Sequence, residues 1–321
     1  MLTIGLMVLA LAGCGALVQS RIQERTNKAE RSHPPEGRIL DVGGVPIHVV
    51  EMGTGPDLVL IHGASGNTRD FTFGFAQKMA ANYRVLVFDR PGLGYSGRAR
   101  LEYDRSFTRA AESPSEQAAL LAQAAAQLGA EAPIVAGHSY GGAVALAWAL
   151  DHPLSGLVVI SGASNTWEGN LGALYQINSS PLGGVISVPL ISALAPKAQV
   201  SDVLMAIFEP DPVPEGYAQY IGAGLTLRPE SLRANARQVN ALKGHLAQMI
   251  PRYGEITVST EIIHGSADTV VGLRIHAEPL ATQIPGAVLT TLEGVGHMPH
   301  HAAPEAVASA INRAAARAGL R

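Results

Sequence analysis

The stretch at residues 137–141, Gly-His-Ser-Tyr-Gly, constrains the fold of this chain more than any other feature. An apolar run at 133–136 precedes it, and a run rich in Ala and Leu follows at 143–150. The first run predicts a buried strand, while the second is too long and too rich in Ala for a strand and predicts a buried helix. The two glycines let the strand and the helix cross closely, and they let Ser139 adopt a strained backbone conformation that lifts its hydroxyl clear of the sheet. We therefore predict a strand, a sharp turn at Ser139 and a helix.

The same alternation of strand and helix continues on both sides of this turn. Short apolar runs predict further strands at residues 57–62, 83–89, 157–162, 258–264 and 287–292. Helices are expected at residues 69–82, 114–128, 273–283 and from 304 onward, the second of these behind a Ser-Pro-Ser-Glu capping box. Two segments joined through a Gly-Gly turn, 38–42 and 46–52, predict an antiparallel hairpin. Because strands and helices alternate, we expect an α/β fold with a mostly parallel sheet flanked by crossover helices.

Residues 165–254 interrupt this rhythm with glycine, proline and mixed helical patterns. We interpret them as a mainly helical cap, or lid, inserted into a core formed by residues 38–164 and 255–321. An insertion that leaves a sheet and returns to it usually packs over the strand ends, where ligands bind. We therefore expect the cap to cover the functional site.

The first twenty residues carry no charged side chain, and residues 2–18 are almost wholly apolar. They are long enough for about 26 Å of helix, at the short edge of a membrane span. Basic residues follow from Arg21 onward, which by the positive-inside rule places the folded domain on the cytoplasmic side. We expect residues 1–20 to form a membrane anchor or signal segment, with membrane association through residues 2–18, and residues 21–37 to form a linker.

Two other interpretations of this segment stay open. Residues 11–14, Leu-Ala-Gly-Cys, are similar to a lipobox, which would make the chain an exported lipoprotein with Cys14 as the lipidation site. The absence of Lys and Arg before Cys14 argues against export, because export signals usually begin with a positive region. The third interpretation is a helix buried in the fold.

The charge balance and the cysteine count exclude several kinds of partner. With 23 basic and 26 acidic side chains, no strong field attracts nucleic acid, so we expect no nucleic-acid binding. Cys14 is the single cysteine, which excludes an internal disulfide and a cysteine-based metal cluster.

A serine hydroxyl becomes a good nucleophile when a base takes its proton and a carboxylate holds that base. Asp268 follows the predicted strand 258–264, and His297 follows the predicted strand 287–292. We therefore expect a catalytic triad of Ser139 as nucleophile, His297 as base and then acid, and Asp268 as the group that holds the histidine. The backbone N–H of Tyr140, at the start of the helix, is expected to stabilise an oxyanion.

In these features the chain resembles the α/β-hydrolase superfamily, in its serine-nucleophile, esterase- and lipase-like branch with a cap domain. The resemblance runs from about residue 39 to residue 321, with the serine at the turn called the nucleophile elbow. It rests on motifs in the family's order: His62-Gly63, Asp89-Arg90-Pro91-Gly92, residues 137–142 and Gly294-Val295-Gly296-His297. It implies that the Ala64 backbone N–H is the second oxyanion donor. Ser65 and Asn67 could add side-chain donors, although Asn67 could equally cap the next helix.

Several residues compete for these roles. In some members of the superfamily the acid follows the strand before the cap, but here the first carboxylate after that strand is Glu168. Asp89 also ends a strand, and we expect it to orient Arg90 and its loop. His300 and His301 compete with His297 as the base. We expect three more histidines to be structural hydrogen-bonding groups: His62, His138 and His264.

The sequence thus predicts a serine hydrolase that cleaves a small-molecule carboxylic ester or related acyl bond, without a cofactor. The apolar cap and N-terminus indicate an apolar substrate. Ser139 argues against haloalkane dehalogenases and epoxide hydrolases, which use a carboxylate nucleophile. Thioesterases, amidases or peptidases, C–C hydrolases, cofactor-free peroxidases and a weakly catalytic ligand-binding protein stay open. We expect no metal site, because the cluster of His297, His300 and His301 lacks a matched carboxylate ligand.

Overall fold

The computed structural model describes residues 2–320, with the side chains of residues 2–12 and of Lys197 outside that description. Its eight-stranded sheet has the order β1-β2-β4-β3-β5-β6-β7-β8. β2 runs antiparallel to its neighbours β1 and β4, and all other neighbouring strands pair in parallel. The mostly parallel sheet is therefore confirmed. The strands are β1 (Arg38–Val42), β2 (Val45–Met52), β3 (Asp57–Ile61), β4 (Arg84–Phe88), β5 (Ile134–His138), β6 (Gly156–Ile160), β7 (Ser259–Gly265) and β8 (Val288–Leu292).

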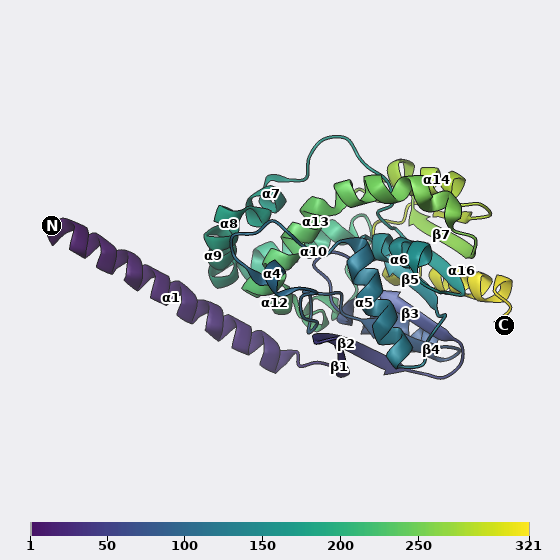
Figure 1. Ribbon diagram of the computed structural model, residues 1–321, viewed down its shortest axis with the longest axis horizontal. Coiled ribbons are helices and arrows are strands. Elements are labelled where there is room, and N and C mark those ends of the chain that lie inside the picture. Colours follow the sequence, from purple (N-terminus) through teal and green to yellow (C-terminus); the bar gives the residue numbers. More distant parts are fainter. Residues whose placement is uncertain (1, 321) are drawn as a thin grey trace.

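Helices cover both faces of the sheet (Figure 1). Outside the cap they are α1 (Leu2–Ser32), α2 (Arg69–Thr72), α3 (Phe75–Ala80), α4 (Leu101–Asp104), α5 (Pro114–Gln127), α6 (Tyr140–Asp151), α14 (Leu273–Gln283), α15 (Pro299–Ala302) and α16 (Pro304–Arg317). Val59 and Ile61 of β3 join the apolar cluster that contains residues of α5, α6 and α14. Leu58 and Leu60 join the cluster on the other face, with residues of α3 and α16. Side chains alternate between the faces of a strand, so a strand covered on both sides has to be continuously apolar.

The crossing of β5 and α6 has the close contact that the sequence predicted. A Cβ atom added at Gly141 would lie 2.2 Å from the backbone oxygen of Ile61, and one at Gly137 would lie 2.1 Å from the backbone oxygen of Gly141. Ser139, between the two glycines, has φ 54° and ψ −118°. This is a strained conformation for a residue with a side chain, and the surrounding contacts hold it in place.

The segment at residues 165–254 contains helices and loops and, among its described residues, no strand. It leaves the sheet after β6 and returns at β7, as an insertion does. Its helices are α7 (Ala173–Ser179), α8 (Pro181–Val185), α9 (Ser187–Leu194), α10 (Lys197–Phe208), α11 (Tyr217–Tyr220), α12 (Ala223–Thr226) and α13 (Pro229–Met249), followed by the 3₁₀ helix η1 (Ile250–Glu255). We refer to residues 165–254 as the cap.

Two helical segments differ from what the sequence suggested. The helix expected at 69–82 is divided into α2 and α3, because Gly74 between them has φ 129°, which no helix permits. The expected linker at 21–37 is largely helical, since α1 continues to Ser32.

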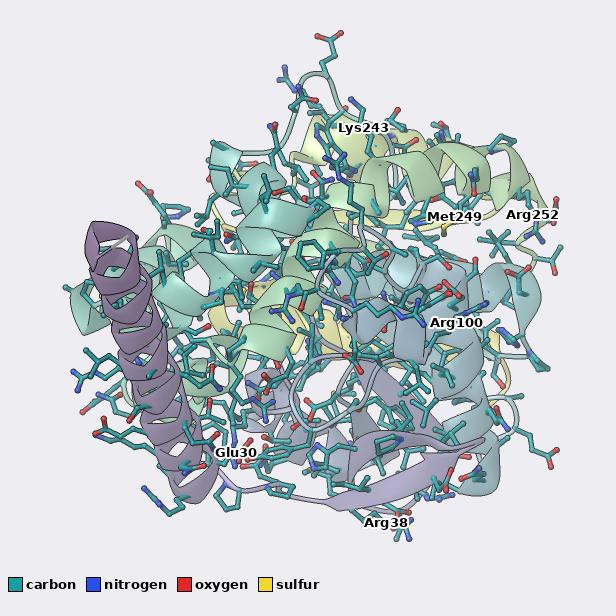
Figure 2. All side chains as sticks on the ribbon, turned by 60° about the vertical axis from the view of Figure 1, so that its left-hand side comes forward. Glu30, Arg38, Arg100, Lys243, Met249 and Arg252 are labelled. Atoms are coloured by element: carbon teal, nitrogen blue, oxygen red, sulfur yellow. The ribbon has the colours of Figure 1, made fainter. Side chains whose placement is uncertain are left out.

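The C-terminal part of α1 stays ordered because it packs against the cap. The guanidinium of Arg25 donates to the carbonyl oxygens of Ala193 and Ala195 at the end of α9, at 3.0 and 2.8 Å. The last carbonyls of a helix have no partner within the helix, so these bonds satisfy groups that would otherwise be unpaired. Glu30, on the side of α1 that faces the rest of the molecule (Figure 2), pairs with Arg228 at 2.9 Å.

The membrane span expected at residues 2–18 is not confirmed. The expectation rests mostly on residues 2–12, and the side chains of these residues lie outside the description. Among the residues described, no single helix is both long enough and apolar enough to cross a membrane, whereas the bent pair of 173–179 and 181–194 meets the same criteria of length and composition.

The close crossing makes a prediction for stability. The substitution Gly141→Ala should lower the free energy of unfolding by about 1–3 kcal/mol, because α6 and β3 have to separate to admit the methyl group. The matched control is Gly244→Ala within α13, where an added Cβ has no neighbour within 4 Å. That change should raise stability by about 0.5–1 kcal/mol, since alanine has the higher helix propensity. Urea denaturation measures both, and equal effects would contradict the packing argument.

Candidate active site

The three residues predicted to form the triad lie at the same edge of the sheet. Ser139 follows β5, Asp268 follows β7 and His297 follows β8, and the carboxyl ends of these parallel strands point the same way. All three are buried, with exposed fractions of 8%, 7% and 3%. The fold thus gathers residues that are far apart in the sequence.

Asp268 and His297 form a direct hydrogen bond, with 2.8 Å between Oδ2 and Nδ1. The other carboxylate oxygen, Oδ1, accepts from the backbone N–H groups of Val270 and Val271, both at 2.8 Å. Nε2 of His264 lies 3.2 Å from Oδ2. Burial alone would raise the pKa of Asp268, but the hydrogen bonds from His264 and His297 hold this pKa well below its usual value. The carboxylate therefore stays ionised and keeps a fixed orientation beside His297.

His138 joins the nucleophile strand to the loop of His297. Its Nε2 donates to the carbonyl oxygen of His297 at 2.8 Å, and the two rings lie 4.8 Å apart. The next residue, Ser139, donates its backbone N–H to the carbonyl of Ile160 in β6 at 3.0 Å. These bonds fix the serine turn and the histidine loop relative to each other, which agrees with the structural role expected for His138.

The two expected oxyanion donors follow the ends of the neighbouring strands β5 and β3. Tyr140 is the first residue of α6, and Ala64 follows the end of β3. Among the described residues, neither backbone N–H donates to a protein acceptor. First-turn N–H groups of a helix are unpaired within the helix and are therefore available to an anion.

Ser65 and Asn67 form hydrogen bonds with the cap and with the start of α2. The backbone N–H of Ser65 donates to Oδ1 of Asn235 in α13 at 2.7 Å, and Asn235 Nδ2 donates to the Ser65 hydroxyl at 2.9 Å. Thr226 of α12 donates to the Ser65 carbonyl at 2.7 Å. Asn67 accepts from the N–H of Arg69 at the start of α2 and donates to the carbonyl of Ile221. The loop after β3 is therefore bound to the cap on several atoms.

Sequence reasoning missed Asn235 and Thr226. They lie 170 and 161 residues from Ser65 in the chain, and nothing in their own surroundings distinguishes them from other polar cap residues. Their contacts with Ser65 depend on how the cap packs against the core.

The competing residues have other positions and partners. Glu168 is exposed. Asp89 accepts from the backbone N–H groups of Thr68 and Tyr95 at 2.7 and 2.8 Å, and it bonds to His48. Asp89 therefore orients the loop after Arg90, as expected, through the N–H of Tyr95, whereas the Arg90 side chain is bonded to other groups.

Arg90 is instead held by other groups. Its guanidinium donates to the side chains of Gln117 and Gln238 and lies over the ring of Tyr140 at 4.1 Å. A planar guanidinium can form hydrogen bonds at its edge while it stacks on an aromatic face, and Arg90 does both.

His300 and His301 lie away from Asp268 and against a different carboxylate, that of Asp70 in α2. Nε2 of His300 is 3.3 Å and Nε2 of His301 is 3.0 Å from Asp70 Oδ1. Burial lowers the pKa of His300 to about 4, so the ring is neutral near pH 7. The sequence gives no indication that Asp70 contacts His301, because the two residues are 231 positions apart.

Two characterised proteins are similar to this chain over most of its length. A magnesium-chelatase 30 kDa subunit of Rhodobacter capsulatus is 28% identical over 274 residues, which cover 84% of this chain and 91% of that protein. A 2-hydroxy-6-oxo-6-phenylhexa-2,4-dienoate hydrolase of Burkholderia cepacia is 27% identical over 258 residues, 78% of this chain and 84% of that protein.

Solved structures share the fold. A membrane phospholipase A aligns over 99% of this chain and 98% of its own, with a TM-score of 0.61 and 21% identity. An esterase from Exiguobacterium antarcticum aligns over 86% of this chain and 98% of its own, with a TM-score of 0.67 and 22% identity. Residues 58–310 match the family model described as the alpha/beta hydrolase family. The match spans most of the chain, and the protein is therefore a member of the α/β-hydrolase family.

Proposed function

We propose that the protein is a serine hydrolase that cleaves a carboxylic ester or a related acyl bond through an acyl-enzyme on Ser139. The observation that carries this proposal is the hydrogen bond of 2.8 Å between Asp268 and His297, at the sheet edge that also holds the strained Ser139 turn. A serine, a histidine and an ionised carboxylate in this arrangement are the groups that acyl transfer requires.

The proposed reaction uses these groups in turn. His297 takes the hydroxyl proton of Ser139 while Oγ attacks the acyl carbon, which forms a C–O bond and a tetrahedral oxyanion. The N–H groups of Tyr140 and Ala64 stabilise that negative oxygen, and removal of one such donor typically costs about 3 kcal/mol. His297 gives its proton to the departing alcohol as the old ester bond breaks. Water, activated by the same histidine, then releases the acid and restores Ser139.

The relatives support a second candidate within the same chemistry. The Burkholderia cepacia relative is named as a hydrolase of 2-hydroxy-6-oxo-6-phenylhexa-2,4-dienoate, a substrate without an ester bond. C–C hydrolysis on the same triad is therefore the alternative that the comparisons favour over thioesterase or amidase activity.

We further propose that the substrate is a small ester with an apolar acyl group. Leu171 and Tyr175 of the cap pack against the apolar cluster that includes Tyr140, and the hydroxyl of Tyr175 bonds to the side chain of Ser65, the residue after Ala64. Apolar side chains beside the reacting bond stabilise an apolar acyl group by removing its surface from water.

The first test is covalent labelling of the nucleophile. A fluorophosphonate probe should form a stoichiometric adduct with the wild-type protein and none with Ser139→Ala, because the probe captures an activated serine. The same variant should lower kcat/KM for an ester by about 10³-fold or more. Ser161→Ala, a buried serine at the end of the neighbouring strand β6, is the matched control and should keep the label. Labelling that persists in Ser139→Ala would contradict the proposal.

The second test is substrate choice. Across p-nitrophenyl esters of increasing acyl length, kcat/KM should rise by about 10-fold or more before it levels off, as each buried CH₂ contributes about 0.8 kcal/mol. A flat profile would argue against an apolar acyl site. Faster cleavage of 2-hydroxy-6-oxo-6-phenylhexa-2,4-dienoate than of any ester would favour the C–C hydrolase alternative.

The third test concerns the contact between the cap and the loop after β3. Asn235→Ala should lower kcat by about 10-fold with little change in KM. Without the Asn235 side chain the loop that carries Ala64 is less firmly held, so the Ala64 N–H stabilises the oxyanion of the transition state less well. Asn235→Asp, which keeps an acceptor for the Ser65 N–H, should recover most of the loss. Asn240→Ala, on an exposed part of the same helix, is the control. An equal loss in both alanine variants would show a general effect on α13.

A further inference from the structure

A second group of titratable side chains lies beside the proposed triad and takes no part in its chemistry. It consists of Asp70 in α2, His138 at the end of β5, and His300 and His301 in α15, and we call it the Asp70 cluster. Asp70 Oδ1 lies 3.3 Å from Nε2 of His300 and 3.0 Å from Nε2 of His301, and Oδ2 lies 3.8 Å from Nδ1 of His138. All four residues are buried or nearly so. The ligand atoms of Asp70, His300 and His301 lie within 4.8 Å of one another.

Asp70 differs from the other buried carboxylates of the described chain in how its charge is balanced. Glu112 and Glu261 are paired with arginines. Asp89 and Asp268 each accept two backbone N–H groups. Among the described residues, Asp70 has neither kind of partner, and its contacts are imidazoles and the hydroxyl of a tyrosine. Oδ1 accepts from the hydroxyl of Tyr217 at 2.8 Å and lies 3.0 Å from Nε2 of His301, so neutral donors balance this buried charge, and a cation at the same place would stabilise it further.

The histidines present unpaired nitrogens toward this carboxylate. His138 donates from Nε2 to the carbonyl of His297, so the neutral ring carries a lone pair on Nδ1. That Nδ1 is buried, faces Asp70, and has no hydrogen-bond partner among the described residues. Nε2 of His300 likewise faces Asp70 without a hydrogen bond. Lone pairs that face a carboxylate repel it unless a positive charge lies between them.

We propose that the Asp70 cluster binds one divalent transition-metal ion, and that this ion is Zn²⁺. Imidazole nitrogens with one carboxylate oxygen form a ligand set that zinc favours. Tetrahedral zinc with bonds of about 2.0–2.1 Å separates its ligand atoms by about 3.3 Å. The distances from Asp70 Oδ1 to His300 and His301, 3.3 and 3.0 Å, are close to that separation.

His138 lies beside these three ligands, with its Nδ1 3.8 Å from Oδ2 of Asp70, and is outside the group whose ligand atoms lie within 4.8 Å of one another. With three protein ligands, water takes the fourth position of a tetrahedral zinc ion. We assign the ion a structural role, because its ligands join α2 to α15.

The proposed ion would tie together the elements that hold the catalytic histidine in place. Asp70 belongs to α2, and α15, which carries His300 and His301, begins two residues after His297. The cap joins through Tyr217, whose hydroxyl donates to Asp70 Oδ1 at 2.8 Å. The expectation that the histidine loop lacks a matched carboxylate is corrected here, because α2 supplies one.

Metal content tests the proposal directly. The full chain, purified without a histidine tag, incubated with ZnCl₂ and dialysed, should contain about one zinc per molecule by mass spectrometry. Asp70→Asn and His301→Gln should each reduce this content at least 10-fold. His245→Gln, which removes a partly buried histidine of α13 outside the cluster, is the matched control and should keep the zinc.

Two measurements on the wild-type protein test metal binding without relying on a variant that has to fold. After removal of metal with a chelator, added Zn²⁺ should raise the Tm, because a ligand that binds the folded state stabilises it. Added Co²⁺ should produce the strong visible absorption of a tetrahedral site, saturating at about one ion per chain. No retained zinc, no rise in Tm and no cobalt band would overturn the proposal and leave a proton shared between Asp70 and His301. Fluorophosphonate labelling of Ser139 would be unaffected by that result, so the two proposals fail separately.

Discussion

The structure depends on one close contact, the crossing of α6 over β3 and β5. Gly141 approaches the backbone of Ile61 so closely that a Cβ would overlap its oxygen, and this approach turns the chain sharply at Ser139. The strained turn presents the hydroxyl at the sheet edge and places the N–H of Tyr140 at the start of a helix. The proposed nucleophile and the proposed oxyanion donor at Tyr140 therefore both depend on a single packing constraint.

Buried charge organises the region around that turn. The Asp268 carboxylate is surrounded by backbone N–H groups and imidazoles that favour its ionised form, which suits a group that holds the base of a hydrolase. The Asp70 carboxylate, in contact with His138, is surrounded by imidazoles and one hydroxyl. The two carboxylates resemble each other in burial, and their different partners point to different roles, one in acyl transfer and one in the binding of a metal ion.

The cap contacts both the loop that carries Ala64 and the Asp70 cluster. Asn235 reaches the loop that carries Ala64, Tyr217 reaches Asp70, and α9 of the cap is held from outside by Arg25 of α1. Movement of the cap would therefore change hydrogen bonds at the proposed oxyanion site.

The sequence alone determined the order of the elements, the parallel sheet, the turn at Ser139 and the places of Asp268 and His297. Each of these follows from local patterns: apolar runs of strand or helix length, glycines where chains cross, and polar residues directly after strands. Tertiary structure alone decided the partners of Ser65, the division of the helix at Gly74 and the meeting of Asp70 with His301. These depend on contacts between residues up to 231 positions apart, and local patterns carry no information about such contacts.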